Sequence, residues 1–290
     1  MTPRPIDHLV LAVRDLEGTR DIYRRLGFTL TPVARHPFGT ANSLALFNGS
    51  YLELLSVADP AAIPEATQDR FSFGAFNRDY LKERQGPSML ALRSADAEAD
   101  RQSFAKHGLP VYAPLTFERN AEGPDGVERE VAFSLTYTSD ARTRGKAGFF
   151  TCQHHHPQNL WRPEFMRHPN GALRVDSAVF VTRDPADFHI FFTYFTGQHE
   201  MLSTSLHVKF DLGGSSLDVL SPVAFRAYFG EDAGADPRCF TGYRVAVRDL
   251  ASTRRLLAAN GAPFVELSGA LIVPSEFALG AAVAFVPAEL

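Results

Sequence analysis

A four-residue string that occurs near both ends of the chain constrains the fold more than any other feature. Val-Arg-Asp-Leu occupies residues 13–16 and returns at residues 247–250, each time after a short apolar segment and before a helical stretch that stops at glycine. A repeated strand-to-helix start indicates a repeated supersecondary unit, which fixes the architecture before any single residue is interpreted.

The first copy shows what one unit contains. A β-type run at 6–13 leads into a helix over 17–26 that Gly27 stops. Strand-like segments follow at 28–34, 43–47 and 51–57, and the turn pair Asn48-Gly49 joins the last two. The unit therefore reads βαβββ.

Two weaker starts lie between these copies, at 88–93 and 177–184, so four units are expected. The later helices and strands are predicted at 97–107, 111–117, 129–138 and 148–152 in the second unit, 188–195, 206–212 and 216–220 in the third, and 251–259, 263–267, 270–273 and 281–286 in the fourth. The second strand of the third unit is poorly marked. Because a four-stranded sheet with a helix on one face leaves its other face uncovered, the units should pair. The predicted class is α+β, with four βαβββ units forming two cupped, mixed-sheet halves.

Residues that favour turns and loops mark the boundaries between the units. Residues 58–85 are expected to link the first two units, and the stretch 157–171, rich in Pro, Arg and Asn, to separate the halves. The predicted domains are 1–170 and 171–290. Units that pair within one chain can also pair between two chains, so both a monomer and a homodimer stay open.

Composition narrows the function classes. Of 290 residues, 45% are apolar and 21% charged, which is typical of a globular protein. The net charge of −4 is the wrong sign for holding a phosphate backbone, so nucleic acid is not an expected partner. No apolar run approaches the roughly 20 residues that span a bilayer, and no signal segment is recognisable. The sequence therefore predicts a cytoplasmic protein with a small-molecule partner, no membrane partner and two reduced cysteines, Cys152 and Cys239.

Particular residues in these units make the chain resemble a known protein superfamily. His8 lies in the first strand, Glu53 in the last strand of the first unit, and residues 149–154 close the second unit, with residues 161–164 behind them. Tandem βαβββ units with these residues resemble the vicinal oxygen chelate superfamily, and the whole-chain layout resembles the glyoxalase-like domain proteins. The resemblance implies a cup that holds one divalent metal, Fe, Mn, Zn or Ni, with ligands from first and last strands. His8 and Glu53 match those positions.

The remaining ligand is expected from the second unit. Ser88 takes the position that matches His8, while Cys152 lies opposite Glu53 and His154 follows on the same face. His154 is the expected third ligand, which would complete a two-His, one-carboxylate set. His155 and His156 remain alternatives, and His156 is also a candidate substrate contact. Each of these candidate ligands also has an interpretation without a metal. Glu53 would pair with an arginine, His8 or Glu53 would face solvent at a sheet edge, and the run of three histidines would be the polar end of a strand.

The sequence of the second half has few candidate metal ligands. Ser177 and Gly242 match His8, and only Asp218 matches Glu53 with an acid, so this half is expected to be structural or to shape the substrate site. Trp161 and Arg162 are candidate substrate-binding residues, as a lid or an anion clamp, or else part of a surface linker. Cys152 is expected to be a buried filler rather than a nucleophile.

The expected function is a divalent-metal-dependent enzyme that acts on a small substrate with two neighbouring oxygen atoms, of lyase/isomerase or dioxygenase type, with Glu53 as the catalytic residue. Isomerisation of the glyoxalase type needs a second carboxylate as base, which the second unit does not supply, whereas oxygen chemistry needs only the triad. The alternative is a non-catalytic protein of the same fold that sequesters a small ligand.

Overall fold

The computed structural model describes residues 3–234 and 237–288 and contains the four βαβββ units. The first unit consists of β1 (Ile6–Ala12), α1 (Leu16–Arg25), β2 (Ala34–Arg35), β3 (Thr40–Leu46) and β4 (Tyr51–Val57). The second consists of β5 (Gly86–Arg93), α3 (Ala97–Lys106), β6 (Leu115–Glu122), β7 (Glu128–Thr138) and β8 (Gly148–His154).

The second half repeats the same order of elements. The third unit consists of β9 (Ala172–Val181), α5 (His189–Thr196), β10 (Met201–Ser203), β11 (His207–Asp211) and β12 (Ser216–Leu220). The fourth consists of β13 (Cys239–Val247), α7 (Leu250–Ala259), β14 (Val265–Leu267), β15 (Ala270–Val273) and β16 (Ala282–Pro287). The predicted fold class is confirmed.

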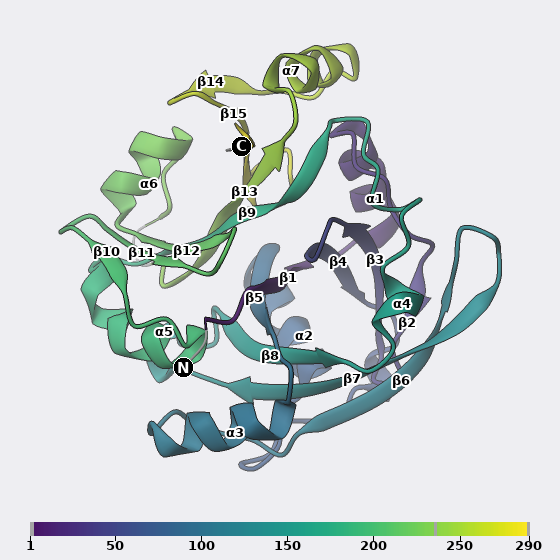
Figure 1. Ribbon diagram of the computed structural model, residues 1–290, viewed down its shortest axis with the longest axis vertical. Coiled ribbons are helices and arrows are strands. Elements are labelled where there is room, and N and C mark those ends of the chain that lie inside the picture. The colour runs from purple at the N-terminus through teal and green to yellow at the C-terminus, as the bar shows by residue number, and fades with distance from the viewer. Residues whose placement is uncertain (1–2, 235–236, 289–290) are drawn as a thin grey trace.

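The units pair within the chain into two eight-stranded mixed sheets (Figure 1). Sheet 1 has the strand order β2-β3-β4-β1-β5-β8-β7-β6, and sheet 2 has the equivalent order β10-β11-β12-β9-β13-β16-β15-β14. At the centre of sheet 1, β1 lies parallel to β4 and antiparallel to β5. The two ends of this sheet, β2 and β6, contact each other, so sheet 1 curves into a barrel-like cup.

The repeated Val-Arg-Asp-Leu string is a helix start. Asp15 caps α1 by accepting a hydrogen bond from the Gly18 amide at 3.1 Å, and Asp249 caps α7 by accepting one from the Ala251 amide at 3.0 Å. The following leucine is the first helical residue in both units. The string therefore recurs because, in both units, the aspartate after the first strand caps the helix that follows.

Successive side chains of each strand point to opposite faces of its sheet, so the protein has a shared core between the sheets and a separate core on each inner face. Residues on the outer faces of both sheets, with the helices between them, form one cluster in which Phe149 contacts Phe180, Phe191 and Phe240. The inner face of each sheet carries its own smaller cluster. Sheet 1 therefore has a buried interior of its own, separate from the core that joins the halves.

Two helices that the sequence did not predict lie against these inner faces. α2 (Phe73–Glu83) falls in the stretch 58–85 expected to be a linker and lies beside β1 and β4 of sheet 1 (Figure 1). Its Phe73 belongs to the cluster on the inner face of that sheet. α6 (Pro222–Phe229) packs Phe225 and Phe229 into sheet 2. A short helix, α4 (Pro157–Leu160), lies in the stretch between the halves. None of the described helices is long and apolar enough to cross a membrane.

Candidate metal and substrate site

The interior of sheet 1 contains a pocket with an empty volume of about 410 Å³, here called the cup pocket. Its polar lining residues are His8, His36, Asn42, Glu53, Arg119 and Cys152, and its aromatic ones are Phe38, Tyr51, Phe73, Phe117, Phe133 and Phe150; Leu44 and Leu135 complete it. Glu53 is the one carboxylate in this lining. The pocket thus combines a small set of chemically active groups with a largely aromatic wall, as small-molecule sites do.

His8 is fixed in the pocket by its neighbours on both sides. Its Nδ1 is 2.6 Å from Oδ1 of Asp7, and its ring stacks on Tyr51 with centroids 4.3 Å apart. The pairing of β1 with β5 shifts register between Ile6 and His8, and this irregularity lets two successive residues approach each other. With Nδ1 held by a carboxylate, Nε2 is directed to the pocket and lies 3.7 Å from Oε2 of Glu53.

Glu53 lies between two imidazoles. Its other oxygen, Oε1, accepts a hydrogen bond from the Asn42 side chain at 2.6 Å and is 3.8 Å from Nε2 of His36. Thr40 contacts Nδ1 of His36 at 2.8 Å, so this second imidazole also presents Nε2 toward Glu53. Burial, followed by the charges of Arg119 and His8, holds the pKa of His36 well below its usual value, which keeps the ring neutral. A neutral imidazole is the form that binds a metal.

His36 and Arg119 were missed by the sequence analysis for the same reason. The predicted strands 28–34 and 111–117 end just before them, whereas the structure places His36 directly after β2 and Arg119 within β6. The two strands lie at the ends of sheet 1. Along 115–122 the apolar residues Leu115, Phe117 and Ala121 alternate with polar ones, and this alternation in the sequence is the signal that would have extended the second strand past Arg119.

His154 lies on the opposite side of His8 from Glu53. Its Nε2 is 2.9 Å from Oδ2 of Asp7, the same carboxylate that holds His8, and its ring stacks on Trp161 at 5.8 Å. The structure therefore brings His8 and Glu53 together and places His154 behind them, joined through Asp7. Burial alone would raise the pKa of Asp7, but the charges and hydrogen bonds of His154 and His8 outweigh it and hold that pKa well below its usual range.

The other predicted contacts lie outside the cup pocket. His156 is close to Glu130 at 3.2 Å and is partly exposed, while Arg162 lies 4.0 Å from Asp125 and lines a second, outer pocket. Trp161 packs edge-on against Tyr51 at 5.7 Å, so it supports the wall of the site from behind. His155 points to Ser134, 2.8 Å from its hydroxyl.

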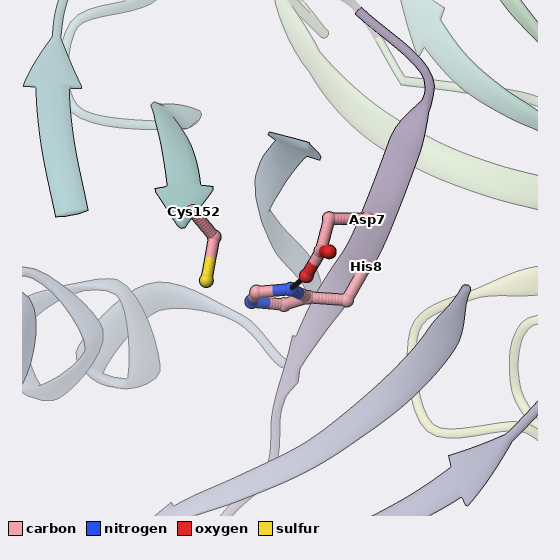
Figure 2. A group of neighbouring side chains, drawn as sticks. All are labelled: Asp7, His8 and Cys152. Carbon is pink, nitrogen blue, oxygen red and sulfur yellow. Dashed lines mark hydrogen bonds and ion pairs between the residues drawn. The ribbon is translucent and has the colours of Figure 1, made fainter. Parts of the chain in front are cut away.

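Cys152 approaches the site from β8. Ligand atoms of Asp7, His8 and Cys152 lie within 4.8 Å of one another, and Figure 2 shows the sulfur directed at the His8 ring from the side away from Asp7. Burial raises the pKa of the Cys152 thiol well above its usual value, which keeps it protonated and unreactive as a nucleophile. Asp7 is already engaged by two imidazoles and does not line the pocket. Among the lining residues, the side chains of a type that binds metals are those of His8, Glu53, His36 and Cys152.

His8 and Glu53 lie close enough to share a divalent metal. Two ligands of one ion with bonds of about 2.1 Å lie no more than about 4.2 Å apart, and the 3.7 Å between His8 Nε2 and Glu53 Oε2 is within that limit. His36 faces the other oxygen of Glu53, at 3.8 Å, and its Nε2 lies 3.3 Å from the side-chain nitrogen of Asn42. Asn42 Oδ1, beside them, is buried with no hydrogen-bond partner among the described residues. With His36 added, the two imidazoles and one carboxylate would be a set of the kind that suits Fe(II), Mn(II), Zn(II) or Ni(II).

Sheet 2 provides an internal comparison. Asp218 pairs with Val179 as Glu53 pairs with Val10, so the predicted equivalence of the two acids holds. Asp218 is fully buried and binds Arg244 at 2.6 Å and His207 at 3.1 Å. An arginine thus supplies in sheet 2 the positive charge that a buried carboxylate requires.

The strand pairing corrects one register assignment and agrees with another. Ala91 pairs with Phe150 as His8 pairs with Tyr51, so Ala91, not Ser88, is equivalent to His8 in the second unit. Gly242 pairs with Ala282 as His8 pairs with Tyr51, so Gly242 keeps its predicted match with His8. Counting from the strand start fails for Ser88 because the pairing of β1 with β5 carries irregularities that shift the register.

Comparisons with solved structures agree with this architecture. The chain superimposes on a hypothetical protein from Staphylococcus aureus with a TM-score of 0.68 at 14% identity, covering 98% of this chain and 99% of that one. It is similar to a variant of 4-hydroxymandelate synthase from Streptomyces coelicolor (TM-score 0.56, 10% identity, 98% and 92% covered). It is also similar to a variant of homoprotocatechuate 2,3-dioxygenase from B. fuscum (TM-score 0.56, 11% identity, 98% and 72% covered).

At these identities the structural likeness shows the fold alone. No curated protein matches the sequence. The profile of the family described as "Glyoxalase-like domain" matches residues 6–193, which include both units of sheet 1, the cup pocket and the start of sheet 2. The expected resemblance to the vicinal oxygen chelate superfamily is thereby confirmed, and the chain belongs to the family of glyoxalase-like domain proteins.

Proposed function

We propose that this protein is a divalent-metal-dependent enzyme that acts on a small substrate through two neighbouring oxygen atoms, with His8 and Glu53 as metal ligands. The observation that carries the proposal is the 3.7 Å separation of His8 Nε2 and Glu53 Oε2 inside a mostly aromatic pocket. Both side chains are buried, at 3% and 4% exposure for the whole residues, so a bound cation offsets the cost of desolvating the carboxylate.

His36 is the third ligand in this proposal. Its Nε2 faces the second oxygen of Glu53, and its Nδ1 is held by Thr40 as that of His8 is held by Asp7. His154, the ligand expected from the sequence, takes the role of a positioning residue, because it anchors the carboxylate that orients His8. Residues that orient a ligating imidazole through its other nitrogen tune the metal site from behind.

The metal, when bound, acts as a Lewis acid that polarises the two substrate oxygens. The chain's own residues shape the reaction around it: Asn42 fixes one oxygen of Glu53 by hydrogen bonding, and the aromatic wall excludes water. The position equivalent to Glu53 in the second unit is Cys152, so the pocket lacks a second carboxylate that would serve as base. This lining favours the dioxygenase type of chemistry over isomerisation of the glyoxalase type.

The test is elemental analysis of protein purified without chelator and without a metal affinity column. We expect about one divalent metal per chain, with most of it lost in Glu53→Gln and in His8→Ala. Asp218→Asn is the matched control, because it removes the register-equivalent carboxylate of sheet 2, and it should retain the metal. Circular dichroism checks that each variant is folded.

Protein that retains no metal after exposure to Fe(II), Mn(II), Zn(II) and Ni(II) in turn would contradict the proposal and favour the non-catalytic, ligand-sequestering alternative. Undiminished metal in folded Glu53→Gln would remove Glu53 from the site. Loss of metal in His154→Ala but not in His36→Ala would restore the ligand set expected from the sequence.

A further inference from the structure

Arg119 is a half-buried cation that the metal proposal does not use. It extends from β6 on the same side as Phe117 and lines both the cup pocket and the outer pocket. Its Nη1 donates a hydrogen bond to the backbone oxygen of Asn120 at 3.3 Å. Its Nε is buried and has no hydrogen-bond partner among the residues that the structure describes.

A buried, unpaired N–H on a charged group is costly. An anion that enters the pocket would satisfy the free donor and offset the desolvation. The guanidinium is therefore poised for a ligand group that the protein does not itself supply.

We propose that Arg119 binds a carboxylate of the molecule that occupies the cup pocket, so that the ligands of this site are small organic acids with a flat, apolar body. With Nη1 engaged by Asn120, the edge formed by Nε and Nη2 remains, and two parallel donors on one edge match the two oxygens of a carboxylate. The apolar body follows from the wall beside this edge, where Phe117 lies edge-on to Phe38 at 5.0 Å and close to Phe133 at 5.3 Å.

The outer pocket, which shares Leu44 and Arg119 with the cup pocket, has the matching charge. It is lined by three arginines, Arg35, Arg119 and Arg162, against two acids, Glu122 and Glu128, so its lining is positive in a chain whose net charge is −4. Nε of Arg162 is likewise buried with no hydrogen-bond partner in the described ranges. A positive lining on a negative protein concentrates anions beside Arg119.

The inference shares the pocket of the proposed function but does not depend on the metal, and its test separates the two. The probes are 3-phenylpropanoate and its neutral isostere 3-phenylpropanamide, titrated into the full-length protein as purified and into Glu53→Gln, with binding followed by calorimetry or ligand-observed NMR. We expect the acid to bind at least tenfold more tightly than the amide in both backgrounds.

Arg119→Met should reduce that ratio to below twofold, and Arg119→Lys, which keeps the charge but not the two-donor edge, should leave an intermediate ratio. Arg254→Met, which removes an exposed arginine of α7, is the control and should leave the ratio unchanged. Equal binding of acid and amide to the wild-type protein, no detectable binding of either at 20 mM (about the weakest affinity worth assigning to a site), or an acid preference that survives in folded Arg119→Met would overturn the inference. A preference that survives Arg119→Met but disappears in Glu53→Gln would assign the carboxylate to the metal instead.

Discussion

At the scale of single residues, His168 shows how the first half holds a neutral imidazole in place. Nδ1 of His168 accepts a hydrogen bond from the Thr29 amide at 3.0 Å, and Nε2 donates to the Leu46 carbonyl at 2.8 Å. The ring packs against Phe28 and Phe47. Protonation would place a second N–H against the Thr29 N–H, so the folded state favours the neutral ring.

This arrangement makes stability depend on pH in a defined window. Burial lowers the pKa of His168 from 6.5 to about 4, so the unfolded chain binds this proton more readily than the folded one. The stabilisation is fully present above pH 6.5 and is lost as the pH falls toward 4. Urea unfolding at pH 7 and pH 4.5 should show a loss for the wild type that exceeds the loss for His168→Gln by about 2 kcal/mol.

Glutamine keeps one acceptor and one donor but does not titrate, and it is therefore the informative substitution. His199→Gln, at an exposed histidine, is the control and should lose as much stability as the wild type. Identical pH dependence in His168→Gln and the wild type would mean that His168 titrates normally.

The site residues divide into those that sequence reasoning finds and those that only the folded chain identifies. His8 and Glu53 were found because each stands in a strongly apolar strand, where a polar side chain is unexpected. His154 was assigned to the correct face of β8, but Asp7 intervenes, and no sequence pattern shows that a strand irregularity places Asp7 between two imidazoles. His36 and Arg119 lie at the edges of sheet 1, where tertiary contacts and not periodicity determine the strand ends.

At the scale of strands, β12 and β13 show how sheet 2 compensates the buried acid at the position equivalent to Glu53. Asp218 is buried, and Arg244 from the neighbouring half of the sheet neutralises it. The sequence predicted Asp218 as a remnant of the Glu53 position but gave no indication of Arg244, because the register of β13 against β9 shifts along the pair. The helices and strands of the repeated units were predicted closely, whereas α2 and α6, which lie outside the repeat although each has a serine N-cap, were not.

Removing Arg244 should expose the cost of that buried charge. Arg244→Met leaves Asp218 buried with His207 and Ser216 as its neighbours, and we expect the free energy of unfolding to fall by about 3 kcal/mol. The pair Arg254–Glu266 is exposed on both sides, so Arg254→Met should cost less than about 1 kcal/mol in the same urea titration.

The double variant Arg244→Met, Asp218→Leu makes the interpretation specific. Replacing both charges with apolar groups removes the unpaired carboxylate, and most of the lost stability should return. A double variant no more stable than Arg244→Met alone would show that the arginine acts through packing and not through Asp218.

At the scale of the whole molecule, the two sheets share one core but differ in what their cups contain. The outer faces and helices of both halves form a single cluster, so the halves support each other, while each inner face is closed by its own inserted helix. Sheet 2 neutralises its buried acid with an arginine, whereas sheet 1 keeps a carboxylate between two imidazoles and an arginine without a partner for its Nε. The two halves therefore share one framework but differ in the charged groups that their inner faces bury.

The central claim is that a divalent metal binds between His8 and Glu53 inside sheet 1. The most direct measurement is an anomalous difference map from crystals of the metal-loaded protein, recorded at the absorption edge of the metal that the protein retains. We predict a single strong peak about 2.1 Å from Nε2 of His8 and from a carboxylate oxygen of Glu53, with His36 as the third protein ligand. A peak bound by His154 and not by Glu53, a peak in sheet 2, or no peak in the cup pocket would contradict it.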